Sequence, residues 1–333
     1  MALPSLSSPP TNCWGLYQYL AQRLPGYDPS EYLREINSGY IHVWEEISKL
    51  RNQYFSQTLT VSVVTAQTTY DLAYNTDNAL SNAISPRLYT ILRVRVQPPS
   101  GAFLQTSSAN GPNDPDFLSV SANPSAQPTQ TGPYYWYLIG HNSICFALPL
   151  AVGSNIEVTY VMWPLALVFL FGGTVSSAGT VVTGNGTNFT QLVQPDFQYA
   201  LPSQGTSQEI LQAELVCAGA NNNGQVYRVG IVNSDILLNT LNPIVPALPS
   251  SSSYVLATLP EIPREHIRVI ASVAMQKMYS VDGDDARSAE WMGIAEKNLQ
   301  MCKDSLIERQ ANNPPKKQRF PGGIGRRNRV FLR

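Results

Sequence analysis

The sequence is poor in charged residues, which make up 14% of its 333 residues, against about 25% in an average globular domain. A surface with so few charges is typical of a protein that covers much of itself with partners. It is equally typical of a β-rich protein whose surface carries Ser, Thr, Asn and Gln. Hydrophobic residues make up 43% of the chain, and its length allows two or three domains with buried cores.

Cysteines are also few and lie far apart: Cys13, Cys145, Cys217 and Cys302. Without a C-x-x-C pair or a neighbouring histidine they form no usual zinc or redox motif, and free, mostly buried thiols are expected, as in a reducing cytoplasm.

We expect no signal peptide, because the first twelve residues lack a basic segment and a long apolar run. The most hydrophobic stretch, 158–171, is too short to cross a bilayer and is interrupted by Pro164. It predicts two buried strands, and no membrane association is expected.

Catalytic motifs are missing as well. His42, His141 and His266 stand at no metal-binding or triad spacing, and there is no G-x-S-x-G, H-E-x-x-H or P-loop. We therefore expect a protein that is not an enzyme and has no cofactor.

Asp282-Gly283-Asp284-Asp285 resembles the start of a calcium loop. However, the glycine and the bidentate acid that such a loop needs are replaced by Arg287 and Gly293. Asp284 or Asp285 is instead predicted to cap the helix that follows.

Helices are predicted at the N-terminal end of the chain. Thr11 or Asn12 can cap a short helix that stops at Pro25-Gly26. Asp28-Pro29-Ser30-Glu31 then offers an acidic cap, a proline at the first helical position and a capping box. Apolar residues follow at spacings of three and four and predict a helix over 29–55 whose seam packs against another helix, in this chain or a neighbouring one: Leu33, Ile36, Tyr40, Val43, Ile47 and Leu50.

The middle of the chain is predicted to be β structure. Alternating residues indicate a first set of strands at 59–64, 69–72, 88–96, 134–139, 143–148 and 155–162, and a second set at 179–183, 213–217, 225–232 and 253–256. The stretch 97–133, rich in Pro, Ser, Asn and Gly, is predicted to be an irregular surface loop. Tyr134–Tyr137 could stack on sugars or bases, but alternate members of a strand face opposite sides, so half of them are expected in the core.

Helices return after Pro263. A first helix places Ile267, Ile270, Ala271, Ala274 and Met278 on one face, and a second carries an apolar stripe of Met292, Ala295, Leu299, Cys302 and Leu306. The order predicts an α+β fold: N-terminal helices (1–57) and a C-terminal helical hairpin (258–311) form a bundle, a β domain (58–167) and a β module (168–257) are inserted, and an extended tail (312–333) follows.

The tail carries the clearest charge asymmetry. It holds seven basic residues and no acid after position 315: Lys316, Lys317, Arg319, Arg326, Arg327, Arg329 and Arg333. Because the whole chain has 22 basic and 23 acidic residues, 15 basic and 23 acidic residues remain outside the tail. Phe320, Val330, Phe331 and Leu332 interleave with the charges, which favours strand addition or insertion into a protein groove over nucleic-acid binding or plain disorder.

The segment from Leu259-Pro260-Glu261 to Met275, followed by Tyr279, the acidic loop at 282–284 and the helix 286–306, resembles the head-to-tail connector (adaptor) proteins of tailed bacteriophages. The helix 29–55, the strand at 70–72 and the stretch 155–164 match that family in kind and order. Residues 173–189 and 233–238 resemble a small β module that recurs in phage structural proteins.

The resemblance implies a virion protein at the neck, assembled in the bacterial cytoplasm. About twelve copies would form a ring between the portal protein and the tail proteins (tube, nozzle or hub), with DNA passing through the channel without sequence-specific binding. The tail would dock on the portal, while the helical seam with Leu299 and Leu306 would pack the bundle or the ring. Two alternatives stay open: a trimeric tail-fibre or receptor-binding protein that binds glycans, and, less favoured, a cell-wall hydrolase.

Overall fold

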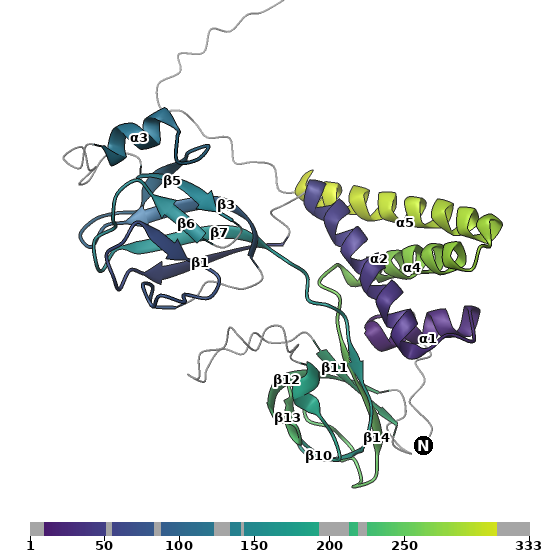
Figure 1. Cartoon of the computed structure of the whole chain (residues 1–333). Coiled ribbons are helices and arrows are strands. Elements are labelled where there is room, and N and C mark those ends of the chain that lie inside the picture. The colour runs from purple at the N-terminus through teal and green to yellow at the C-terminus, as the bar shows by residue number, and fades with distance from the viewer. Residues whose placement is uncertain are drawn as a thin grey trace, which may run out of the picture.

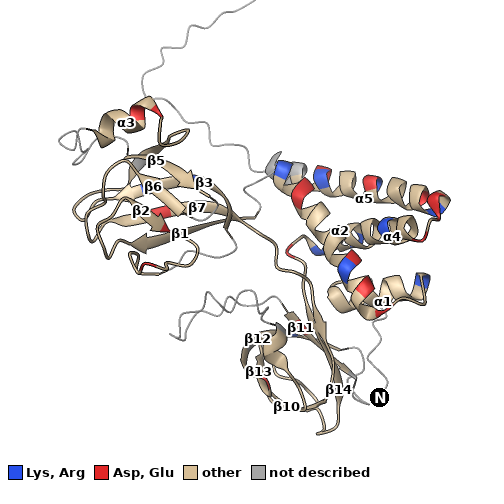
Figure 2. Ribbon diagram, in the orientation of Figure 1, with Lys and Arg blue, Asp and Glu red and all other residues tan. Residues whose placement is uncertain are grey.

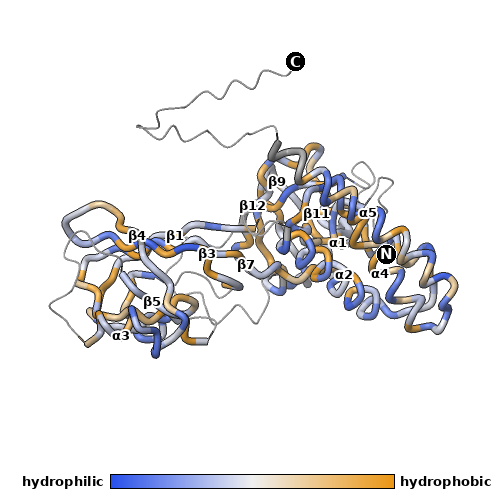
Figure 3. Tube along the Cα trace, turned by 90° about the horizontal axis from the view of Figure 1, so that it is seen from above, coloured by the Kyte–Doolittle hydropathy of each residue, from blue (hydrophilic) through white to orange (hydrophobic). Residues whose placement is uncertain are grey.

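The chain has an α+β fold with helices and two seven-stranded β-sheets (Figure 1). The α+β class expected from the sequence is confirmed. The computed structural model describes residues 10–50, 55–82, 88–122, 134–140, 143–192, 213–218 and 225–311. Seen from above, the strands β1 to β7 and the long helices lie at opposite ends of an elongated arrangement (Figure 3).

The helices begin where the capping residues predict. α1 (Cys13–Arg23) is capped by Asn12, whose Oδ1 accepts a hydrogen bond from the Gly15 N–H at 2.9 Å. At the start of α2 (Pro29–Leu50), the Glu31 carboxylate accepts from the Asp28 N–H at 3.1 Å, which is one half of the capping box. The described helix ends at Leu50, five residues before the predicted end, and 51–54 lie outside the described residues.

Two helices follow the β structure. After a short 3-10 turn, η4 (Arg264–His266), come α4 (Ile267–Val281) and α5 (Asp285–Ala311). Asp284 caps α5, because its Oδ1 accepts from the Arg287 N–H at 3.0 Å. The stripe predicted for α5 needs one correction: Met292 is 51% exposed. Trp291, one position earlier, packs on the core at the place that the spacing assigned to Met292.

α4 lies against both α2 and α5 (Figure 1). α2 approaches α4 so closely at Gly39 that an added Cβ would stand 2.9 Å from the Ile270 carbonyl oxygen. Residues from both ends of the chain thereby share one hydrophobic core, which also takes in Val216, Val255 and Ala257 from the second sheet.

The first sheet has the strand order β1-β7-β3-β4-β5-β6-β2 and encloses its own core. All its pairs are antiparallel except β4 with β5. The prediction that 97–133 is irregular is wrong in part, because this stretch supplies β4 and the helix α3 (Pro115–Ser121). The strands are β1 (Ser56–Ser62), β2 (Thr69–Asp71), β3 (Leu88–Gln97), β4 (Leu104–Ser108), β5 (Tyr134–Ile139), β6 (Ser143–Phe146) and β7 (Asn155–Met162).

The second sheet has the order β8-β14-β11-β12-β13-β10-β9. A bridge from Val175 in β9 to Ser252, next to β14, curls it toward a barrel. The strand predicted at 179–183 is present as β10, but it begins two residues later, because Gly179, at φ +64°, forms a turn between β9 and β10. The strands are β8 (Phe169–Leu170), β9 (Thr174–Ala178), β10 (Val181–Asn185), β11 (Ala213–Ala218), β12 (Val226–Ser234), β13 (Leu237–Thr240) and β14 (Ser253–Thr258).

The apolar stretch 158–171 forms β7 and β8 with a break between them, as predicted. Among the described residues, no helix combines the length and the apolar character needed to span a bilayer.

Candidate interaction surfaces

Most of the residues predicted to pack the bundle or the ring are buried in the hydrophobic core of the chain itself. Ile36, Tyr40, Val43 and Ile47 are at most 1% exposed, while Leu299 and Leu306 are 9% and 3% exposed. Leu33 is half-buried on the same core, and the side chain of Leu50 lies outside the described residues. Their burial leaves these side chains little surface for a neighbouring subunit, so contacts between subunits would have to use other positions.

α2 connects three distant segments of the chain through polar contacts. The Asn37 amide donates to the Leu167 carbonyl at 2.8 Å and accepts from the Leu167 N–H at 2.6 Å. The Tyr40 hydroxyl accepts from the Glu261 N–H at 2.9 Å. Lys277 on α4 donates to the Ser38 hydroxyl. The stretch after β7 and the entry to α4 are thereby held on one helix.

A charged contact joins α2 to the second half of α5. Lys303 Nζ lies 2.7 Å from Glu46 Oε2, and Lys49 Nζ lies 2.6 Å from Glu46 Oε1. Hydrogen bonds from these two ammonium groups, Lys303 first, lower the pKa of Glu46 from 4.5 to about 2. The end of α5, from which the basic tail continues, is therefore fixed beside the end of α2.

The second sheet meets the helices at a buried carboxylate, Glu214 on β11. The side chain of Glu214 is 4% exposed, and its Oε1 accepts from Arg264 Nη2 at 2.7 Å. Its Oε2 accepts from Asn12 Nδ2 at 2.9 Å. One carboxylate therefore bridges the cap of α1, the second sheet and the turn η4. A buried carboxylate is tolerated because both of its oxygens are paired.

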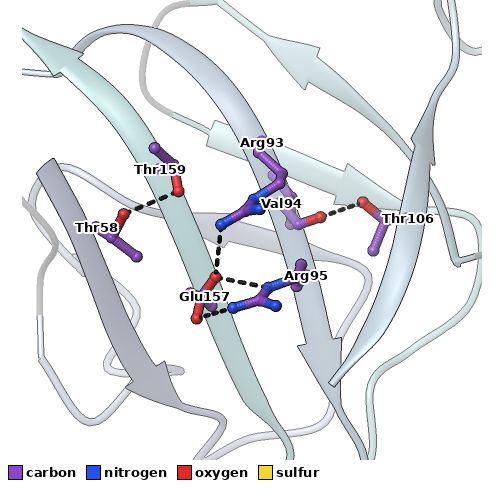
Figure 4. A network of polar contacts seen from close by, with 7 residues as sticks. All are labelled: Thr58, Arg93, Val94, Arg95, Thr106, Glu157 and Thr159. Atoms are coloured by element: carbon purple, nitrogen blue, oxygen red, sulfur yellow. Dashed lines mark hydrogen bonds and ion pairs between the residues drawn. The ribbon is translucent and has the colours of Figure 1, made fainter. Parts of the chain in front are cut away.

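The outer face of the first sheet carries a polar network (Figure 4). Arg95 on β3 binds Glu157 on β7 with two nitrogens, at 2.7 and 2.6 Å, and Arg93 adds a longer contact of 3.4 Å. Hydrogen bonding by Arg95 lowers the pKa of Glu157. Thr58 and Thr159 join hydroxyls at 3.0 Å across β1 and β7. A polar face of this kind is typical of the solvated side of an antiparallel sheet.

The aromatic cluster at the start of β5 is divided between the core and the surface, as the alternation predicts. Trp136 is 7% exposed, and its indole N–H donates to Thr106 Oγ1 at 2.7 Å. Tyr134 packs on the same core. Tyr137 meets Phe117 of α3 edge to face, with ring centroids 4.9 Å apart. Trp136 therefore offers no open ring face for stacking on a ligand.

None of the four cysteines, all of which lie in the described part of the chain, forms a disulfide; Cys145 is half-buried and the others are buried. Burial raises the pKa of the Cys217 thiol to about 12 and also that of Cys13, so both stay protonated near neutral pH. In the described part of the chain, no three His, Cys, Asp or Glu side chains stand close enough together to hold a metal ion. His42 is exposed on α2, and His141 lies outside the described residues.

The predicted docking tail lies wholly outside the described residues, which end at Ala311. No family model and no curated protein matches this chain.

Proposed function

We propose that this chain is a structural subunit of a tailed-phage virion, a head-to-tail adaptor. Copies of it would form a ring of about twelve between portal and tail. The ring would line the channel through which DNA passes.

The contacts of α2 carry this proposal. The segments that resemble the connector family are 29–55, 70–72, 155–164 and 259–306. They are far apart in sequence, yet two of them contact α2: Trp163 stacks on Trp44 with ring centroids 5.1 Å apart, and the Tyr40 hydroxyl accepts from the Glu261 N–H. The strand at 70–72 packs instead in the core of the first sheet.

The distribution of charge supports separate attachment surfaces. Charged side chains are frequent on the helices and sparse on the second sheet (Figure 2). Outside the basic tail, the chain has 23 acidic residues against 15 basic ones. An acidic channel wall would repel the DNA backbone and let it slide, whereas basic side chains would hold its phosphates.

The basic tail is proposed to dock each subunit on the portal. Deleting 316–333 should leave a folded monomer, because the last residue of the described hydrophobic core is Leu306 on α5. Binding to purified portal should be abolished, as measured by co-sedimentation. Unimpaired binding of the truncated chain would reject tail docking.

The tail-fibre alternative has less support from the aromatic cluster than its sequence suggested. The most favourable sugar-stacking residue, Trp136, is buried and hydrogen-bonded to Thr106. A glycan array probed with the full chain separates the two functions: an adaptor gives no specific glycan signal.

A further inference from the structure

The second sheet carries very few charged residues, and two of them lie opposite each other on neighbouring strands. Among its described residues from 169 to 258, the charged ones are Glu214, Arg228 and Asp235. Glu214 on β11 and Arg228 on β12 are direct register partners on neighbouring antiparallel strands. Opposed residues of an antiparallel pair place their Cβ atoms about 5 Å apart on the same face, so an ion pair between these two would be the default arrangement.

That ion pair does not form. Each carboxylate oxygen of Glu214 accepts a hydrogen bond from another residue, one from Arg264 at 2.7 Å and the other from Asn12 at 2.9 Å. Within the described residues, no carboxylate lies within 4 Å of the Arg228 guanidinium. Arg228 is exposed, and none of the described residues accepts a hydrogen bond from its five N–H donors.

The two arginines line the same pocket. It has a volume of about 390 Å³ and lies between the second sheet, the residue before the α1 cap and the turn η4. Besides Glu214 and the arginines, it is lined by Thr11, Val226, Tyr227 and Asn242. Thr11 and Asn242 bring a hydroxyl and an amide, both hydrogen-bond donor groups, to the lining of the pocket.

We propose that this pocket binds the carboxylate of an acidic side chain presented by a partner protein. Two guanidinium groups and one carboxylate line the pocket, and the carboxylate is already paired with Arg264 and Asn12, so the positive charge of Arg228 remains uncompensated. A guanidinium binds a carboxylate through paired N–H donors in a fixed fork. A single remaining charge matches a monoanionic carboxylate better than a phosphate that carries close to two charges at neutral pH. This assignment holds whether or not the chain is a phage adaptor.

The test uses the full chain and two peptides that differ in one group, acetyl-Gly-Glu-Gly-amide and acetyl-Gly-Gln-Gly-amide. Binding is followed through the Nε–Hε resonances of the arginines by NMR, with inorganic phosphate as a third probe. The glutamate peptide should shift the Arg228 and Arg264 signals saturably, and the glutamine peptide should not.

Arg228→Gln should weaken glutamate-peptide binding about tenfold, the loss of one charge-assisted contact. Arg268→Gln is the matched control. Arg268 lies on α4, is exposed like Arg228, and does not line the pocket. Equal shifts by the two peptides, or equal affinity of the two variants, would overturn the proposal. Tighter binding of phosphate than of the glutamate peptide would also overturn it, since the pocket would then be a phosphate site.

Discussion

The side-chain amide of Asn37 forms two hydrogen bonds with the backbone of Leu167, one to its carbonyl and one from its N–H. Asn37 lies in the middle of α2, and Leu167 lies in the stretch between β7 and β8, 130 positions later. One amide therefore joins the helices to the segment that connects the two sheets. Leu167 is itself 1% exposed, so without Asn37 its backbone N–H and carbonyl could not form hydrogen bonds to water instead.

Asn37→Ala should destabilise the chain by about 1–3 kcal/mol, because it leaves two buried backbone groups of Leu167 without a partner. Urea unfolding measures this difference. Asn298→Ala is the control: among the described residues, the Asn298 side chain has one hydrogen bond, to the Ser272 hydroxyl at 3.0 Å, and its removal should cost less. A loss no larger than that of the control would contradict the role given to Asn37.

A second prediction concerns the close crossing of α2 and α4. At Gly39, an added Cβ would stand 2.9 Å from the Ile270 oxygen and 3.3 Å from the Ala274 nitrogen, both backbone atoms. Gly39→Ala should therefore destabilise by about 1–3 kcal/mol, despite the better helix propensity of alanine. Gly293→Ala on α5 is the matched control, since nothing lies within 4 Å of its added Cβ. It should stabilise by about 0.5–1 kcal/mol; equal signs for the two variants would refute the crossing.

A third prediction concerns the acid dependence of stability. The pKa of Glu46 is about 2 in the folded chain, below its ordinary value of 4.5, because Lys303 and Lys49 hold its carboxylate. A lowered folded pKa contributes stability that is present above pH 4.5 and is lost as the pH falls toward 2. Glu46→Gln should thus cost about 1–2 kcal/mol at pH 7, and the difference from the wild type should shrink between pH 4.5 and 2.

Glu45→Gln provides the control for that measurement. Glu45 is adjacent to Glu46 in sequence, and the described residues show no basic group within 4 Å of its carboxylate. Its replacement should give little difference at any pH. A wild-type advantage over Glu46→Gln that stays constant down to pH 2 would contradict the linkage.

Local signals predicted the starts of the helices well. Asn12, the Asp28-Pro29 pair and Asp284 all cap or open helices as their chemistry requires. α3 was missed although Asp114-Pro115 repeats the signal of Asp28-Pro29, and Asp114 does cap it by accepting from the Asp116 N–H. The surrounding excess of Pro, Ser, Asn and Gly outweighed this short signal.

Spacing alone could not fix every side chain or contact. On α5 it found the buried stripe but chose Met292, where Trp291 packs. The Glu214 bridge was beyond sequence reasoning, because its partners Asn12 and Arg264 lie 202 and 50 positions away. Such a contact exists only once the second sheet has folded against the helices.

The most direct test of the adaptor assignment is the mass of the protein alone and with its portal, by native mass spectrometry. The account predicts a monomer of 36.6 kDa in isolation and uptake of about twelve copies on a portal ring. A stable trimer in isolation, or no uptake by the portal, would contradict it.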